Sequence, residues 1–161
     1  MNAIELLEQQ HREVEKVFEK IEKARSDAKE ELFDELADSL AVHAAIEEQH
    51  FYPATKDART EELLQEAVEE HLSAKRVIAD LLECEPSDPQ FDAKVKVLQE
   101  QIDHHVEEEE EELFPKVQKM LSKDELEDLG MVMEDLAQEL LEGGAPRQQV
   151  PAETGAAAPL E

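Results

Sequence analysis

Apolar side chains recur along this chain at alternating steps of three and four residues, the spacing of one face of an α-helix. Asn2 and Glu5 form a capping box, and an apolar face follows until a basic, polar break at about Lys23–Lys29. The residues of this face are Ile4, Leu7, Val14, Phe18 and Ile21. The pattern predicts a first helix that is packed in a bundle.

Four more segments show the same spacing. The predicted helices run from about Lys29 to near Pro53, from Thr60 to Leu82, from about Phe91 to Met120, and from Ser122 to Gly143. Proline lacks an amide hydrogen and clashes with the preceding turn, so Pro53 should end or kink the second helix. The expected fold is all-α, an up-down-up-down four-helix bundle with an additional C-terminal helix.

The composition of the last residues differs from that of the helices. We expect residues 1–142 to form one domain that contains the four-helix bundle and the fifth helix. Residues 143–161 are rich in Pro, Ala and Gly, and the prediction for them is a disordered tail.

Six positions on the apolar faces hold polar residues instead. They are His11, His43, Glu47, His71, His105 and Glu109. A single His on such a face is usually a hydrogen-bonded core residue, but burying a carboxylate costs several kcal/mol unless it is paired or binds a metal. Apart from Lys75, no Lys or Arg shares these faces. A bound cation therefore explains the six residues together.

The polar positions also form a repeat. Each copy reads His-x-x-x-Glu followed by an aromatic residue and a proline, in residues 43–53 and again in residues 105–115. A further His precedes each copy at a similar interval, His11 before the first and His71 before the second. The chain is thus predicted to consist of two similar halves that each supply two His and one Glu.

The spacing within each copy supplies a metal-binding geometry. Residues i and i+4 lie one turn apart on the same helix face, so the His and the Glu of one copy can bind the same centre. Two such turns, with one His from each remaining helix, offer four nitrogens and two carboxylates, and shared carboxylates can bridge two metals. Imidazole and carboxylate suit iron, zinc, manganese or copper, and the residues alone do not rank these metals.

These residues resemble the hemerythrin-like family, also called the HHE cation-binding domain, whose pattern is His…His-x-x-x-Glu…His…His-x-x-x-Glu. The resemblance covers about residues 3–120. It implies a non-haem di-iron centre inside a four-helix bundle, with two iron ions joined by an oxo or hydroxo bridge. It also implies that the four histidines are terminal ligands and that the two glutamates bridge the ions. The histidines are His11, His43, His71 and His105, and the glutamates are Glu47 and Glu109. The family binds dioxygen or related molecules, so the expected partner is a small ligand such as O2, peroxide or NO.

This chain departs from the oxygen-carrying members of the family at two positions. Those carriers have a fifth His one turn after the His of the third helix, where this chain has Lys75. The last carboxylate is Glu109 rather than the Asp of the carriers. Fewer protein ligands would leave more coordination positions open. The departure argues against reversible oxygen carriage and favours sensing, iron handling, or peroxide and nitric oxide chemistry.

Two neighbouring histidines compete with the predicted ligands. His104 would pair with Glu108 in an alternative register, but the apolar stripe through Ile102 and the alignment on the two prolines both select His105. His50 and then Ala54 continue the stripe of Glu47. His50 is thus a candidate for a further ligand, for a residue that supports one, or for a hydrogen-bonded residue near the end of the bundle.

Two other side chains have open roles. Lys75 either projects into the site to pair with a bound anion, or pairs with Glu69 or Glu70, or extends to solvent. Tyr52 either approaches the site or packs beside Pro53 at the end of its helix.

The charge of the chain excludes several classes of partner. A formal net charge of −27 argues against binding to nucleic acid or to an anionic membrane, because both require clustered Lys and Arg. No run approaches the roughly 18 apolar residues of a membrane span, and the acidic N-terminus does not resemble a signal peptide. The lone Cys84 excludes an internal disulfide and fits a reducing cytosol, so the expected location is cytoplasmic. The oligomeric state is left open.

The leading prediction is a di-iron protein that binds or senses oxygen, reactive oxygen or nitrogen species, or iron. The alternative is a di-iron enzyme that acts on hydrogen peroxide or nitric oxide, for which the sequence offers no pocket for an organic substrate. A ferritin-like oxidase fits less well, because those bundles use mostly Glu with Glu-x-x-His turns. A structural or zinc-binding bundle is the remaining alternative.

Overall fold

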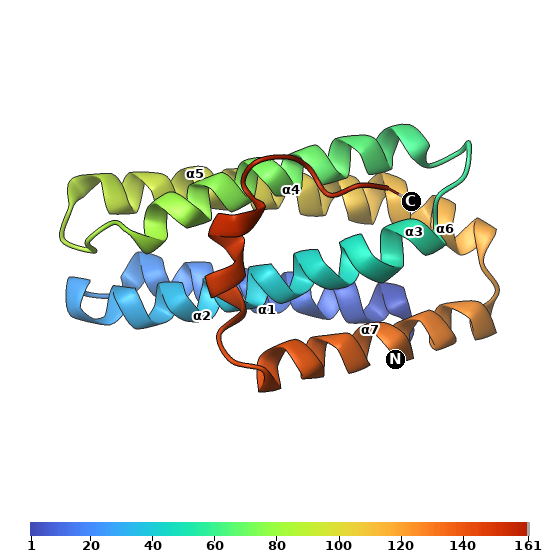
Figure 1. Ribbon diagram of the computed structural model, residues 1–161, viewed down its shortest axis with the longest axis horizontal. Helices are drawn as coiled ribbons and strands as arrows, with labels where there is room; N and C mark the ends of the chain where they lie inside the picture. Colours follow the sequence, from blue (N-terminus) through green and yellow to red (C-terminus); the bar gives the residue numbers. More distant parts are fainter. Residues whose placement is uncertain (161) are drawn as a thin grey trace.

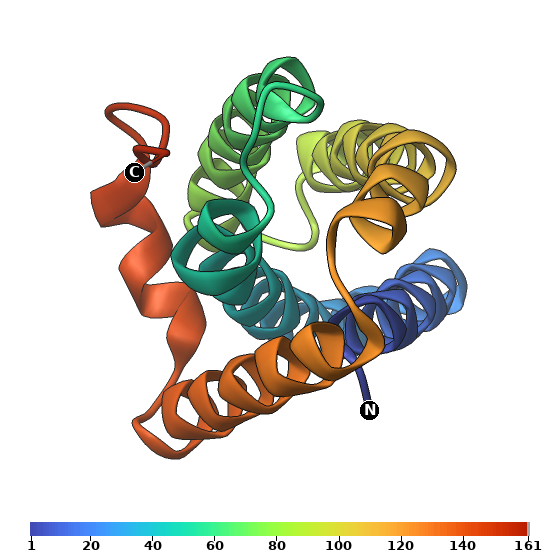
Figure 2. The same ribbon diagram turned by 90° about the vertical axis from the view of Figure 1, so that its right-hand side faces the viewer.

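The computed structural model describes residues 1–160, which form an all-helical bundle (Figure 1). Four long helices lie side by side along its long axis: α1 (Ala3–Lys23), α2 (Ser26–Ile46), α4 (Glu61–Leu82) and α5 (Pro89–Glu108). Figure 2 looks along this axis and shows α1 beside α2, and α4 beside α5, around a common interior. The predicted all-α bundle with an additional C-terminal helix is confirmed.

Two of the long helices continue through a π-helical segment. α2 leads into η1 (Glu47–Phe51) and the short α3 (Tyr52–Ala54). α5 leads in the same way into η2 (Glu109–Leu113) and α6 (Phe114–Met120). The two halves of the chain therefore repeat the same succession of an α-helix, a π segment and an α-helix.

Each π segment begins at one of the two predicted carboxylate ligands and ends just before the aromatic-proline pair. The amide of Tyr52 donates to the carbonyl of Glu47, and the amide of Phe114 donates to the carbonyl of Glu109, five residues back in both cases. The wider π turn accommodates the following proline, which has no amide hydrogen to offer and would crowd a regular α-helical turn. The helix at Pro53 accordingly continues to Ala54 before it ends.

The π segment shifts the buried face of the second helix by one residue. The α-helical spacing predicted His50 and Ala54 on the stripe that follows Glu47, but Ala54 is exposed and His50 is only half-buried. The residues that are buried instead are Phe51, Tyr52 and Thr55. The predicted stripe is therefore wrong beyond Glu47, because each π turn contains one more residue than an α-helical turn.

The predicted helix ends agree with the hydrogen bonds. The Asn2 side chain accepts from the Glu5 amide at 2.9 Å, and the Ser122 hydroxyl accepts from the Glu125 amide at 3.1 Å. The fifth helix, α7 (Lys123–Glu142), crosses the outside of α1 and α2 (Figure 2). Gly130 permits this crossing, because a Cβ at that position would collide with the backbone of residues 1–3.

Two apolar clusters fill the bundle, one toward each end. One cluster includes Leu7, Ile46, Leu64 and Val117, and the other includes Phe18, Phe33, Ile78 and Leu98. The polar positions of the helices lie between these clusters, so the middle of the bundle is a polar layer closed by apolar packing on both sides.

The C-terminal residues differ from the predicted disordered tail. Residues Pro146–Glu153 form the 3₁₀ helix η3, which packs against α2 and α4 (Figure 1). Val150 is buried, the Arg147 guanidinium donates to Asp38 at 3.0 Å, and Lys75 lies 3.1 Å from Glu153. The prediction is therefore wrong for residues 146–153, because contacts with distant helices fix a segment whose composition suggests disorder.

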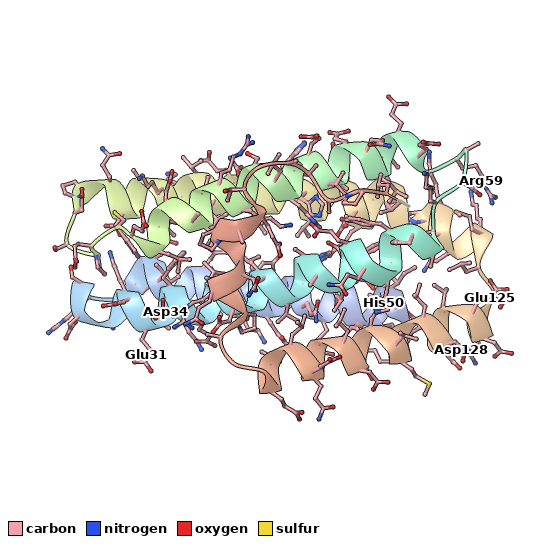
Figure 3. All side chains as sticks on the ribbon, viewed as in Figure 1. Glu31, Asp34, His50, Arg59, Glu125 and Asp128 are labelled. Carbon is pink, nitrogen blue, oxygen red and sulfur yellow. The ribbon has the colours of Figure 1, made fainter. Side chains whose placement is uncertain are left out.

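Charged side chains cover the outside of the bundle. Figure 3 shows Glu31, Asp34 and Asp128 projecting away from the helices that carry them. Within residues 1–160, no helix combines the length and the apolar character needed to cross a membrane.

Candidate metal centre

The six polar residues singled out by the sequence converge in the middle of the bundle. Each of them is at most 7% exposed. The four long helices supply one imidazole each, and each π segment supplies a carboxylate as its first residue. The residues are His11 of α1, His43 of α2, His71 of α4, His105 of α5, Glu47 of η1 and Glu109 of η2.

Each carboxylate lies between an imidazole from the first half of the chain and one from the second half. A carboxylate oxygen of Glu47 lies 3.2 Å from Nε2 of His43 and 3.0 Å from Nε2 of His71. The carboxylate oxygens of Glu109 lie 3.2 Å from Nε2 of His11 and 3.2 Å from Nε2 of His105. A carboxylate in such a position can bridge two cations.

The donor atoms form two groups that are each compact enough to surround one ion. The α1/α2 cluster contains His11, His43 and Glu109, and the α4/α5 cluster contains Glu47, His71 and His105. The ligand atoms of each cluster lie within 4.8 Å of one another. Ligands about 2.1 Å from one metal ion lie roughly 3 Å apart when they are neighbours. The distances around the two carboxylates match this spacing.

The ligand atoms also include buried polar atoms without a hydrogen-bond partner. Within residues 1–160 there are five such side-chain atoms, and four of them belong to the two clusters: His11 Nε2, His43 Nε2, Glu47 Oε2 and Glu109 Oε1. A buried polar group without a partner costs about 1–3 kcal/mol. A bound cation would satisfy all four, so the residues fit a metal ion.

A second layer of side chains fixes the orientation of every imidazole. The Nδ1–H of each histidine donates to a side-chain oxygen at 2.7 Å. The pairs are His11 with Glu110, His43 with Gln10, His71 with Glu48, and His105 with Glu70. These bonds direct each Nε2 lone pair at the centre, as in known metal sites.

None of these four residues was predicted from the sequence to support a histidine. Each one directly precedes or directly follows a predicted ligand in the chain. Glu48 and Glu110 occupy the same place in the two copies, immediately after Glu47 and Glu109. A comparison of the two copies could therefore have identified this pair.

The comparisons with known proteins agree with this geometry. Residues 2–117 match the family described as the Hemerythrin HHE cation binding domain. The chain belongs to this family. A crystal structure of a hemerythrin HHE cation-binding domain-containing protein from Mycobacterium kansasii superimposes with a TM-score of 0.77 at 27% identity. The match covers 93% of this chain and 99% of the other.

A relative with a different description shares part of its length with this chain. A protein described as a DNA nickase from Nostoc sp. is 28% identical over 128 residues. The match covers 79% of this chain but only 36% of the relative, so the HHE domain described here spans about a third of that protein.

In this HHE domain the buried charges already interact before any metal binds. Burial lowers the pKa of His105, but the charge of Glu109 and hydrogen bonds to carboxylates outweigh burial and raise it well above its ordinary value. Burial raises the pKa of Glu47, yet the charge of His43 and hydrogen bonds hold it well below its ordinary value. These opposite pKa shifts show that the buried imidazoles and carboxylates of the centre stabilise each other's charges.

Tyr52 reaches the centre of this domain. Its hydroxyl donates to Glu109 at 2.7 Å and lies 3.1 Å from Glu47. It also lies 3.2 Å from His71 Nε2 and 3.4 Å from His105 Nε2. These distances equal those between neighbouring ligands of one ion. Of the two roles that the sequence left open for Tyr52, the structure favours the approach to the site.

The Tyr52→Phe variant tests whether this hydroxyl contributes to metal binding. Removing it takes one oxygen donor from the α4/α5 cluster and frees the carboxylates, so metal affinity is expected to fall by about tenfold or more. A chelator competition assay measures this change. Phe51→Leu alters a neighbouring buried ring that packs against Tyr52 and Phe114 and supplies no donor atom, so it should keep the wild-type affinity. Equal affinities for Tyr52→Phe and wild type would exclude a role for the hydroxyl.

The two competing histidines lie outside both clusters. The His104 side chain is 61% exposed and lies 3.2 Å from Glu108 and 3.5 Å from Glu70. Figure 3 shows His50 on the side of its helix next to α7, and it belongs to neither group of donors.

Lys75, which stands where oxygen carriers have a fifth His, is nearly buried but does not reach the ligands. Its Nζ donates to both oxygens of Glu48 at 3.0 Å and lies 3.1 Å from Glu153 of η3. The partners expected from sequence, Glu69 and Glu70, are therefore wrong. Lys75 holds Glu48, which in turn holds His71.

A cavity of about 40 Å³ adjoins the four imidazoles. Most of its other walls are apolar, and the residues that form them include Val14, Leu40, Ile78 and Ile102. Val150 and Glu153 of η3, together with Lys75, line it as well. The cavity has room for a molecule of a few atoms.

Proposed function

We propose that this HHE domain is a non-haem di-iron protein that binds or senses dioxygen, reactive oxygen or nitrogen species, or iron. The observation that carries the proposal is the position of Glu47 and Glu109, each between imidazoles of the two clusters. Two shared carboxylates are what a pair of adjacent ions requires, whereas a single ion would need only one cluster.

The choice of iron rests on the membership of the hemerythrin family. Four imidazoles, two carboxylates and a nearby phenol form a mixed nitrogen and oxygen set that is compatible with iron. Iron bound here would supply one-electron redox chemistry and affinity for small oxidants. The protein holds the ligands, orients each imidazole through Nδ1, and excludes bulk water with its two apolar clusters.

The cavity supports a small ligand. Three donors per cluster leave coordination positions free, and the cavity of about 40 Å³ next to the imidazoles has room for a small molecule such as O2, hydrogen peroxide or NO. Its apolar walls at Ile78 and Ile102 favour uncharged molecules over ions. The hydroxyl of Tyr52 lies among the ligands and can donate a hydrogen bond at the centre.

The second candidate is catalysis at the same centre, with hydrogen peroxide or nitric oxide as the substrate. The buried hydroxyl of Tyr52 favours this possibility, because it places a hydrogen-bond donor at the centre. The DNA-directed activity named for the Nostoc relative finds no support in this domain, since a net charge of −27 repels a phosphate backbone.

Iron content and spectra test the proposal. Protein purified without added metal is expected to contain about two irons per chain and to absorb in the near ultraviolet through ligand-to-iron charge transfer. A spectral change that reverses when O2 or NO is removed supports binding or sensing. Sustained consumption of hydrogen peroxide supports the enzyme. A colourless protein with stoichiometric zinc would contradict the di-iron assignment.

A further inference from the structure

The two metal clusters are related by the internal repeat, so their supporting residues can be compared position by position. Glu110 supports His11 in the α1/α2 cluster, and Glu48 supports His71 in the α4/α5 cluster. Both supports are carboxylates at equivalent positions in the repeat.

Each of these equivalent carboxylates also has its own cation. Arg12 donates to Glu110, and Lys75 donates to Glu48. The carboxylate and its cation contribute no net charge in either half, so this pair of supports makes the two clusters alike.

The other equivalent pair differs in charge. Gln10 directly precedes the first His of the first half and accepts from His43 at 2.7 Å. Glu70 directly precedes the first His of the second half and accepts from His105 at the same distance of 2.7 Å. The two side-chain oxygens occupy equivalent positions in the repeat, and each accepts a hydrogen bond from a histidine Nδ1–H. The oxygen of Gln10 belongs to a neutral amide, whereas that of Glu70 belongs to a carboxylate. No Lys or Arg contacts Glu70 within the described residues.

The aromatic residue after each π segment differs in the same direction. Tyr52 places its hydroxyl among the ligands of the α4/α5 cluster, 3.2 Å from His71 Nε2. The equivalent residue of the second half, Phe114, stacks beside His11 with ring centroids 6.1 Å apart and offers no oxygen. The α4/α5 cluster thus has both the additional negative charge and the additional oxygen donor.

We propose that the two clusters hold metal unequally, with the α4/α5 cluster binding its ion more tightly and the α1/α2 cluster being the position that exchanges its ion. This inference rests on the proposed dinuclear site. A carboxylate that accepts from Nδ1–H makes the imidazole a stronger donor than an amide does, and a single unit of negative charge beside the ion adds to the attraction. Gln10 and Glu70 are therefore the positioning residues that set the difference between the clusters.

A titration with Co²⁺ tests the inference, because the visible absorption of bound cobalt reports each ion as it binds. Wild-type protein is expected to bind two ions in two phases whose affinities differ by about tenfold or more. His43→Ala removes a ligand of the α1/α2 cluster and should leave the tight phase. His71→Ala removes a ligand of the α4/α5 cluster and should leave the weak phase.

Substitutions at the two supporting residues then exchange the properties of the clusters. Glu70→Gln keeps an acceptor for Nδ1–H and should weaken the tight phase, whereas Gln10→Glu should strengthen the weak phase. The double variant should reduce or reverse the separation without changing the total of bound cobalt. Gln9→Glu is the matched control, because it adds the same charge on the exposed neighbour of Gln10 and should leave both phases unchanged.

The outcomes separate this inference from the proposed function. Two ions that bind wild-type protein with equal affinity would overturn the inference and leave the dinuclear site standing. A failure of wild-type protein to bind two cobalt ions would overturn the dinuclear site itself. Phases that do not respond to Gln10→Glu, or that respond equally to Gln9→Glu, would also overturn the roles assigned to the supporting residues.

Discussion

Replacing His105 with Ala is expected to lower the bound metal from about two ions per chain to one or fewer, whereas replacing its neighbour His104 leaves the content unchanged. His105 is buried, and its Nε2 lies 3.2 Å from both Glu109 and His71. The His105→Ala variant therefore removes a donor from the α4/α5 cluster and loosens one of the two shared carboxylates. Metal analysis after removal of free ions measures the difference.

His104→Ala is the matched control for this experiment. The two histidines are consecutive and share a helix, but the His104 side chain is 61% exposed and lies beside Glu108 and Glu70. Glu70 keeps its 2.7 Å bond to His105 when His104 is removed. Removal of His104 should alter neither the fold nor the ligands. Equal losses of metal in both variants would mean that the helix register assigned to His105 and Glu109 is wrong.

Metal binding is also expected to stabilise the folded chain strongly. An ion that binds only the folded protein adds about 2.7 kcal/mol when its free concentration is 100 times the dissociation constant. Two ions would then add roughly 5 kcal/mol, which corresponds to an increase in Tm of about 10–20 °C for a chain of this size. The physical reason is that metal satisfies the four ligand atoms that otherwise lack partners. Thermal unfolding followed by circular dichroism, with chelator and with excess metal, measures the shift.

His43→Ala provides the comparison for the stability measurement. It removes a ligand of the α1/α2 cluster, the weaker site, so the stabilisation by metal should fall by that smaller contribution and stay above half of the wild-type value. The melting temperature in chelator should change much less. A wild-type Tm that is the same with chelator and with metal would contradict the presence of a buried metal site.

The sequence allowed the bundle and the six converging residues to be predicted because both depend on helical spacing. His11, His43 and His71 interrupt apolar stripes at the same depth in their helices, so packing the stripes together brings the imidazoles together. The prolines at equivalent places in the two copies, Pro53 and Pro115, likewise distinguish His105 from His104 in the sequence alone.

Other features depended on contacts or backbone states that spacing does not reveal. The π turn after Glu47 moved Ala54 outward, which no count based on 3.6 residues per turn could predict. The supporting residues Gln10 and Glu70 act on histidines of a neighbouring helix, so only the packed structure connects them. The order of residues 146–153 depends on Val150 and Arg147 meeting α2 and α4, in a segment whose local composition favours disorder.

The composition of each cluster has a consequence for how such a chain could arise. Each cluster takes its two imidazoles from one half of the chain and its carboxylate from the other half. A single half, with its two helices and one π segment, could not complete either position alone. An ancestor of half this length could form such a centre only as a two-fold symmetric dimer. After fusion of two copies, the two halves could accumulate different substitutions. Around the centre they now differ at two equivalent positions, Gln10 in place of Glu70 and Phe114 in place of Tyr52.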